Sequence, residues 1–270
     1  MSYPDSALTL QSLTHRSPQR PLLVFLPGMD GTGLSLQQQV GNLQTEFDLC
    51  FLAIPPDDRT GWSSMVKQTL ALMKAERGSQ RPIYLAGESF GGCLALLVAL
   101  QAPELLDGLI LINSATSFHR QAWQCWGANL VSWMPDALYS TATIGLLPFL
   151  INLRRVPRST QKALRQAMQA VTPRSAAWRI SLLCSFQLEW SQVQALSLPT
   201  LIIASGADQL LDSQAEAHRL SQLLPDAKTV LLPLSGHACL LEPGVCLASI
   251  LKQTEFLAPR CPASQINSGA

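Results

Sequence analysis

The sequence predicts an α/β protein with a mostly parallel sheet covered by helices on both faces. Short apolar runs alternate with longer stretches of helical periodicity through most of the 270 residues. The runs are apolar at consecutive positions, which is typical of strands buried on both faces of a parallel sheet. Hydrophobic residues make up 47% of the chain and charged residues 14%, enough to form a sizeable core.

Each expected strand is an uninterrupted apolar run between polar or Gly/Pro boundaries. The strands are expected at Leu22–Leu26, Leu49–Ile54, Ile83–Ala86, Leu109–Ile112, Thr200–Ala204 and Thr229–Leu232. The expected helices combine apolar residues three and four apart with good helix formers. They are Trp62–Lys74, Gly91–Gln101, Ser213–Leu224 and Glu242–Phe256. Ligands of such a sheet bind at the carboxyl ends of its strands.

The stretch 118–190 interrupts this alternation, because it has helical patterning and no clear strand. It holds eight basic and two acidic residues, a net charge of 8 − 2 = +6, so the rest of the chain carries 1 − 6 = −5. Five of the six tryptophans also lie there: Trp123, Trp126, Trp133, Trp178 and Trp190. We predict a helical cap at 118–190, an α/β core formed by 1–117 and 191–258, and a flexible tail at 259–270.

Composition excludes several classes of protein. The net charge of +1 gives no reason to expect a nucleic-acid partner. The N-terminus lacks the apolar segment of a signal peptide, and no apolar run approaches the length of a membrane span. Seven scattered cysteines without a C-x-x-C pair predict reduced thiols, no metal site and a cytoplasmic location. The basic cap is interpreted as a solvated surface, as peripheral contact with an anionic membrane, or as a surface for an acidic acyl carrier.

The stretch GESFGG, residues 87–92, lies where an expected strand passes into an expected helix. This is the context of a nucleophile elbow, G-x-S-x-G, in which a tight turn lifts the serine hydroxyl above the sheet. Glycines are needed two residues on either side, because side chains there would clash with the crossing strand and helix. Ser89 is therefore the candidate nucleophile; the alternative is a glycine-rich loop without catalytic function. No role is evident for Glu88.

A serine nucleophile needs a base and an orienting carboxylate. Of the four histidines, only His237 follows an expected strand and precedes the last helix, in a loop at the carboxyl edge of the sheet. Asp208 follows the strand Thr200–Ala204 and is the preferred acid. Asp212 is the second choice and suits the N-cap of the next helix better. Asn113 ends another strand, but its amide cannot serve as the acid.

The loop 27–33, with sequence PGMDGTG, follows the first expected strand. An oxyanion hole needs two backbone N–H donors, for which we predict Met29 in this loop and Phe90 after the nucleophile. A phosphate cradle is the alternative, but the loop lacks the lysine of a P-loop and the spacing of G-x-G-x-x-G. We expect no metal or cofactor.

The chain order Ser89, Asp208, His237 is that of α/β-hydrolases. The segments LPGMDGTG (26–33), IPPDDRT (54–60), PIYLAGESFGGCLAL (82–96), NSATSF (113–118) and SGHACLLE (235–242) resemble the hydrolase-like half of the plant and cyanobacterial phytyl ester synthase family. The resemblance runs from about residue 22 to 257. By this match, Ser89 would be nucleophile, His237 base and Asp208 acid.

Members of that family transfer fatty acyl groups to phytol and diacylglycerol, and the plastidial plant members carry a second, acyltransferase-like domain. No histidine of this sequence begins an H-x-x-x-x-D acyltransferase motif. We therefore expect a serine esterase or lipase-like hydrolase acting on a small-molecule, lipid-like acyl ester, with water as the acceptor. Acyl transfer to phytol or a glycerolipid is the alternative, and a non-catalytic ligand-binding protein is a remoter one.

Overall fold

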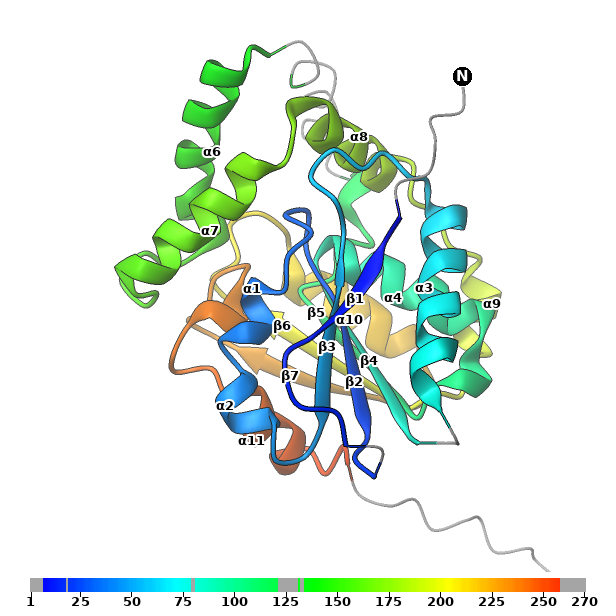
Figure 1. Cartoon of the computed structure of the whole chain (residues 1–270). Coiled ribbons are helices and arrows are strands. Elements are labelled where there is room, and N and C mark those ends of the chain that lie inside the picture. The colour runs from blue at the N-terminus through cyan, green and yellow to red at the C-terminus, as the bar shows by residue number, and fades with distance from the viewer. Residues whose placement is uncertain (1–6, 18, 79–80, 121–130, 132–133, 258–270) are drawn as a thin grey trace, which may run out of the picture.

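The computed structural model describes residues 7–17, 19–78, 81–120, 131 and 134–257 (Figure 1). Its centre is a seven-stranded sheet in the order β1-β3-β2-β4-β5-β6-β7, in which β1 is antiparallel to β3 and all other pairs are parallel. The strands are β1 Thr9–Ser12, β2 Leu22–Leu26, β3 Asp48–Ala53, β4 Ile83–Glu88, β5 Gly108–Ile112, β6 Thr200–Ser205 and β7 Ala227–Leu232.

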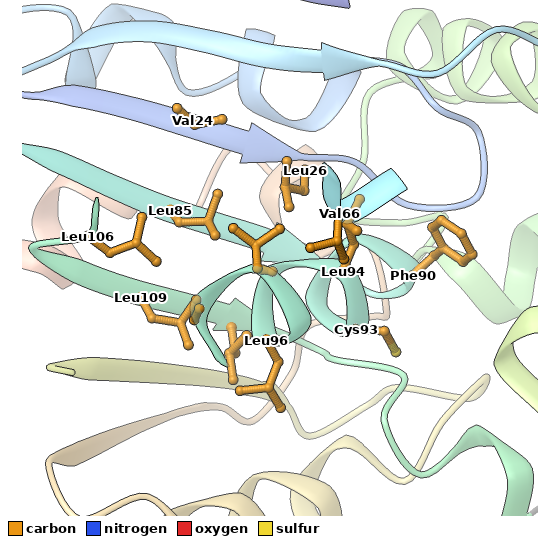
Figure 2. Packing of buried hydrophobic residues seen from close by; sticks show 14 of the residues in the cluster. Val24, Leu26, Val66, Leu85, Phe90, Cys93, Leu94, Leu96, Leu106 and Leu109 are labelled. Atoms are coloured by element: carbon orange, nitrogen blue, oxygen red, sulfur yellow. The ribbon is translucent and has the colours of Figure 1, made fainter. Parts of the chain in front are cut away.

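Both faces of the sheet are covered, as the consecutive apolar runs predict. In β2, Val24 faces the cluster formed with helices α3, α4 and α10, whereas Phe25 faces the cluster formed with α1, α2 and α11. Figure 2 shows part of the first cluster, with Leu94 of α4 packed near Leu26 and Leu85 of the sheet. These helices are α1 Leu34–Gln37, α2 Val40–Leu43, α3 Trp62–Arg77, α4 Phe90–Gln101, α10 Ser213–Leu223 and α11 Leu247–Gln253.

The described residues between β5 and β6 form helices and no strand: η2 Phe118–Arg120, α6 Asp136–Leu150, α7 Arg158–Ala170, α8 Pro173–Cys184 and α9 Trp190–Gln194. Two tryptophans connect α8 to the core. The Trp178 Nε1–H donates to the Thr60 carbonyl and the Trp62 Nε1–H to the Leu182 carbonyl, each at 3.1 Å. The boundaries 118 and 190 of the cap stay a prediction. Trp123, Trp126, Trp133 and the tail 259–270 lie outside the described residues.

The secondary structure departs from the sequence-based expectations in two places. β1 was not expected, and it is a largely exposed edge strand without an apolar pattern. The expected helix Glu242–Phe256 begins only at Leu247, after Pro243 and Gly244, and a 3₁₀ turn at Cys239–Leu241 precedes it. None of the described helices has the length and hydropathy needed to cross a bilayer.

The prediction that all cysteines are reduced is wrong for Cys184, which is disulfide-bonded at the end of α8. Cys50, Cys93, Cys239 and Cys246 are free thiols. Pairing depends on distance in the fold and not on spacing along the chain, so the scattered pattern could not reveal it. Cysteine spacing therefore does not decide the compartment of this protein.

Candidate active site

Ser89 lies between β4 and α4 in the strained backbone conformation that a nucleophile elbow requires. Its φ is +54° and its ψ −114°, a region that residues other than glycine rarely adopt. The flanking glycines are sterically necessary. A Cβ on Gly91 would overlap the carbonyl oxygen of Leu26, and one on Gly87 would overlap that of Gly91. The GESFGG pattern thus reflects a close crossing of strand and helix.

The structure brings Ser89, His237 and Asp208 together in one hydrogen-bonded chain. The Ser89 Oγ lies 2.8 Å from His237 Nε2, and His237 Nδ1 lies 2.7 Å from Asp208 Oδ2. Ser89 is 9% exposed and His237 3%, so the chain is almost shielded from water while the serine stays reachable. The three residues lie 119 and 29 positions apart in the sequence, and the carboxyl ends of β4, β6 and β7 bring them to one edge of the sheet.

Asp208 is oriented by its own loop. Its Oδ1 accepts hydrogen bonds from the amides of Leu210 and Leu211 at 2.9 and 3.0 Å, and Ser213 Oγ donates to its Oδ2. Burial raises the pKa of this carboxyl, but His237, Ser213 and Leu211 together hold it below its ordinary value. Asp208 is therefore ionised at neutral pH.

Asp212 instead accepts a hydrogen bond from the Ala215 amide at 3.1 Å and caps α10. The expectation that Asp212 is a cap is confirmed. Of the two acidic residues after β6, only Asp208 contacts His237.

The loop carrying His237 is fixed by Asn113, at the end of β5. The Asn113 Nδ2 donates to the His237 carbonyl at 2.5 Å and to Ser205 Oγ at 2.8 Å, and its Oδ1 accepts from the Ser205 amide at 2.8 Å. Burial lowers the pKa of His237, but the adjacent Asp208 carboxylate raises it above its ordinary value. The ring therefore gains a proton more readily than a free histidine does.

The loop 27–33 lies beside Ser89: a Cβ added to Gly28 would be only 3.9 Å from the Ser89 Cβ. Phe90 begins α4, and its ring stacks on Trp62 with centroids 4.6 Å apart. The two residues predicted to donate backbone N–H groups, Met29 and Phe90, thus belong to segments that adjoin Ser89.

Two buried ionisable groups near the site were given no role by the sequence analysis. Arg179 of α8 is fully buried and donates from Nη1 to the Met29 carbonyl at 2.6 Å and from Nη2 to the Pro55 carbonyl at 2.7 Å. Glu88 is buried, its Oε1 has no hydrogen-bond partner among the described residues, and burial raises its pKa to about 7. No sequence signal distinguishes Arg179 from the other basic residues of 118–190, whereas Glu88 drew notice through its position beside Ser89.

Residues 60–244 match the protein family described as serine aminopeptidase, S33, and this stretch includes Ser89, Asp208 and His237. The chain belongs to this α/β-hydrolase family. Membership in the S33 family and the observed sheet confirm the predicted α/β-hydrolase fold, and they make this protein serine hydrolase-like.

Two curated relatives of this S33-family chain come from Arabidopsis thaliana. Phytyl ester synthase 1, chloroplastic, is 34% identical over 261 residues, which cover 87% of this chain and 37% of that protein. Phytyl ester synthase 2, chloroplastic, is 33% identical over 265 residues, which cover 87% of this chain and 38% of that protein. The resemblance to the phytyl ester synthases is confirmed, and the chain spans well under half the length of these relatives.

Among solved structures, a thermophilic esterase from Thermogutta terrifontis has the same fold. It superposes with a TM-score of 0.73 at 18% identity, covering 92% of each chain. At this identity the likeness concerns the fold alone.

Proposed function

We propose that the protein is a serine hydrolase that cleaves acyl esters through a covalent acyl-enzyme on Ser89. The observation that carries this proposal is the continuous chain of hydrogen bonds from Ser89 Oγ through His237 to Asp208, at 2.8 and 2.7 Å. A serine hydroxyl is a weak nucleophile at neutral pH, and a base within hydrogen-bonding distance, itself held by a carboxylate, supplies the activation it needs.

In acylation, Ser89 Oγ attacks the ester carbonyl carbon while His237 Nε2 takes the hydroxyl proton. The ionised Asp208 stabilises the imidazolium, and the backbone N–H groups of Met29 and Phe90 donate to the oxyanion of the tetrahedral intermediate. The intermediate collapses by breaking the bond to the leaving oxygen, which receives the proton from His237. An alcohol departs and the acyl group remains on Ser89.

In deacylation, a water molecule attacks the acyl carbonyl as His237 takes one of its protons. Collapse of the second intermediate returns that proton to Ser89 Oγ and releases the free acid. We propose a lipid-like acyl group. The relatedness to phytyl ester synthases supports it, as do the contacts of α6 and α7 with Ala238 and of α8 with Met29. A substrate held in a lipid surface also accounts for the basic composition of 118–190.

The test is hydrolysis of p-nitrophenyl esters from short to long chain, together with labelling by a serine-reactive fluorophosphonate probe. We expect labelling and turnover of the unmodified chain and loss of both in Ser89→Ala, with faster turnover of longer acyl chains. Absence of labelling in the unmodified chain, or equal labelling of Ser89→Ala, excludes Ser89 as nucleophile and favours a non-catalytic ligand-binding role.

Acyl transfer is the second candidate, favoured by the 34% identity to phytyl ester synthase 1. It uses the same acyl-enzyme, with the hydroxyl of phytol or a glycerolipid replacing water. The two functions separate when phytol or diacylglycerol is added to a reaction with an activated acyl donor. Ester product formed faster than free acid identifies a transferase, and free acid as the main product identifies a hydrolase.

A further inference from the structure

The exposed apolar side chains of this protein are concentrated in one place. The described residues include seven large hydrophobic side chains that are strongly exposed, and five of them lie between 138 and 153. These are Leu138, Ile144, Leu146, Phe149 and Leu153, each between 44 and 56% exposed. Scattered exposed hydrophobics are ordinary, but a contiguous group on one helix and the turn after it marks an interaction surface.

Helix α6 has the wrong composition for a helix surrounded by water. The segment 137–150 contains no charged residue. Its contact with the rest of the protein uses one narrow stripe, in which Thr143 and Leu147 are buried. Leu147 packs in a small cluster with Leu164 of α7 and Leu241. Most of the circumference is therefore apolar and exposed, whereas surface helices normally present polar residues to solvent.

Basic residues follow this apolar surface in the sequence, and Gln161 of α7 donates to the Leu153 carbonyl at 2.9 Å. Between residues 137 and 188 the sequence has seven basic and no acidic residues. Two of the seven are engaged internally, since Arg155 pairs with Glu242 and Arg179 is buried. Besides Arg155, the exposed basic residues of this stretch are Arg154, Arg158, Lys162 and Arg174. Arg158, Lys162 and the partly exposed Arg165 are spaced i, i+4, i+7 and share one face of α7.

We propose that α6 and the turn to α7 form a docking surface for an anionic lipid bilayer. The surface consists of the five exposed apolar residues with Arg154, Arg158 and Lys162. Apolar side chains would enter the acyl-chain boundary while the cations contact lipid phosphates, as in amphipathic helices that lie in a membrane interface. At 15 residues, α6 is about 22 Å long, so it suits an in-plane orientation and not a span.

The positive charge of the surface favours an anionic bilayer over a second copy of the chain as its binding partner. Two copies meeting through α6 would bring two cationic borders together, which like-charge repulsion opposes. The surface also lies next to the candidate site, because the Ala238 amide, one residue after His237, donates to the Leu150 carbonyl of α6 at 2.8 Å. Docking would hold the site at the bilayer, where a lipid-like substrate resides; this last consequence rests on the proposed function.

The test is co-sedimentation of the full chain carrying Ser89→Ala with vesicles of phosphatidylcholine alone or mixed with phosphatidylglycerol. We expect binding to the anionic vesicles and little to the neutral ones. Binding should weaken when salt is raised from about 0.1 to about 1 M, because the screening length falls from about 10 to about 3 Å. Equal binding to both kinds of vesicle, or none to either, overturns the proposal.

Two double variants test the two parts of the surface. The double variant Leu146→Asp and Phe149→Asp should weaken partitioning of the protein onto anionic vesicles at least about tenfold. The double variant Arg158→Ala and Lys162→Ala should weaken it roughly thirtyfold, because each basic residue contributes about fivefold. The matched control is Leu231→Asp on β7, whose leucine is 47% exposed but lies outside the surface. An effect of Leu231→Asp as large as that of the α6 variant contradicts the assignment.

Two further measurements distinguish the remaining outcomes. Light scattering measures the oligomeric state. If the unmodified chain is a dimer that the α6 double variant converts to a monomer, the surface binds a second copy of the chain and the lipid proposal is overturned. Hydrolysis of soluble p-nitrophenyl butyrate by chains that retain Ser89 should be unchanged in both double variants. A double variant that loses vesicle binding but keeps hydrolysis shows that the substitutions act on the docking surface and not on the catalytic site. An unmodified chain that binds vesicles but hydrolyses no ester refutes the proposed function without affecting the docking proposal.

Discussion

Glu88 is a buried carboxyl group at the last position of β4, directly before Ser89. Burial raises its pKa to about 7, while Ser35 and His237 lower it by less. This group is therefore partly protonated at neutral pH. An apolar side chain at the same position would carry no desolvation penalty. Its negative charge also favours the protonated form of His237, so ionisation of Glu88 is coupled to the site.

The ionisation of Glu88 predicts a pH-dependent effect of Glu88→Gln on stability. The unfolded chain loses this proton near pH 4.5, whereas the folded chain retains it up to about pH 7. The unmodified protein therefore loses stability relative to the variant as pH rises through this window, because the folded state binds more protons. The rise in the Glu88 pKa from 4.5 to about 7 corresponds to roughly 3 kcal/mol of unfolding free energy over the full pH range.

Urea unfolding at pH 5 and pH 9 measures this difference. The free energy of unfolding of Glu88→Gln relative to the unmodified chain should increase by roughly 2.5 kcal/mol between the two pH values, since the unfolded carboxyl is already partly ionised at pH 5. Glu104→Gln, at an exposed position, is the control and should show no such trend. A Glu88→Gln effect of equal size at both pH values contradicts the assignment of a raised pKa.

At the scale of elements, the crossing of β2 and α4 explains the G-x-S-x-G pattern. Gly91→Ala should abolish folding or lower the melting temperature by more than 10 °C, roughly the effect of a few kcal/mol, because the added Cβ overlaps the Leu26 carbonyl oxygen.

The matched control is Gly41→Ala in α2, where a Cβ would meet nothing within 4 Å. There we expect stability to rise by about 0.5–1 kcal/mol. Thermal unfolding followed by circular dichroism compares the two, and similar melting temperatures would count against a steric origin of the pattern.

Helix α8 holds the loop 27–33 through Arg179, whose guanidinium donates to the Met29 carbonyl. If the Met29 N–H stabilises an oxyanion, releasing this loop should cost part of that stabilisation. We expect Arg179→Ala to lower kcat roughly 10- to 100-fold, less than the loss of a whole donor, with a smaller change in KM.

Added guanidinium should restore part of the kcat of Arg179→Ala by occupying the space left by the side chain. Arg174→Ala, on the exposed side of α8, serves as the control and should keep the original kcat. An Arg179→Ala protein that shows the original kcat with only a lower melting temperature would restrict Arg179 to a structural role.

The same elements show what could be predicted from the sequence. The central strands were found within about two residues because burial on both faces leaves an uninterrupted apolar run. The hydrogen-bonded residues Ser89, His237 and Asp208 were selected from the sequence because strand ends and required glycines leave local patterns. Strand β1 was missed because its residues are mostly exposed and it is defined by pairing with β3. Arg179 was missed because its partner carbonyls lie 150 and 124 positions away.

At the scale of the whole molecule, the helices α6 and α7 are attached to the core at few points. One is a small apolar cluster with Ala238 and Leu241. Another is the ion pair of Arg155 with Glu242, a carboxylate that is 1% exposed and also accepts from Ser235 Oγ at 3.1 Å and the Gly236 amide at 2.9 Å. The sheet, by contrast, is covered on both faces by large clusters. Such an unequal distribution of buried contacts predicts local opening of α6 and α7 well below the free energy of global unfolding.

Removing the Arg155 side chain should increase this local opening selectively. In Arg155→Ala the buried Glu242 loses its cation but keeps two hydrogen-bond donors, so we expect a loss of about 1–2 kcal/mol. Amide hydrogen exchange in α6 and α7 should then accelerate roughly 5- to 30-fold, while exchange in β2, β4 and α4 stays unchanged. Arg154→Ala, at the neighbouring exposed position, should leave exchange everywhere as it was. Equal acceleration in the sheet would mean that α6 and α7 unfold only together with the core.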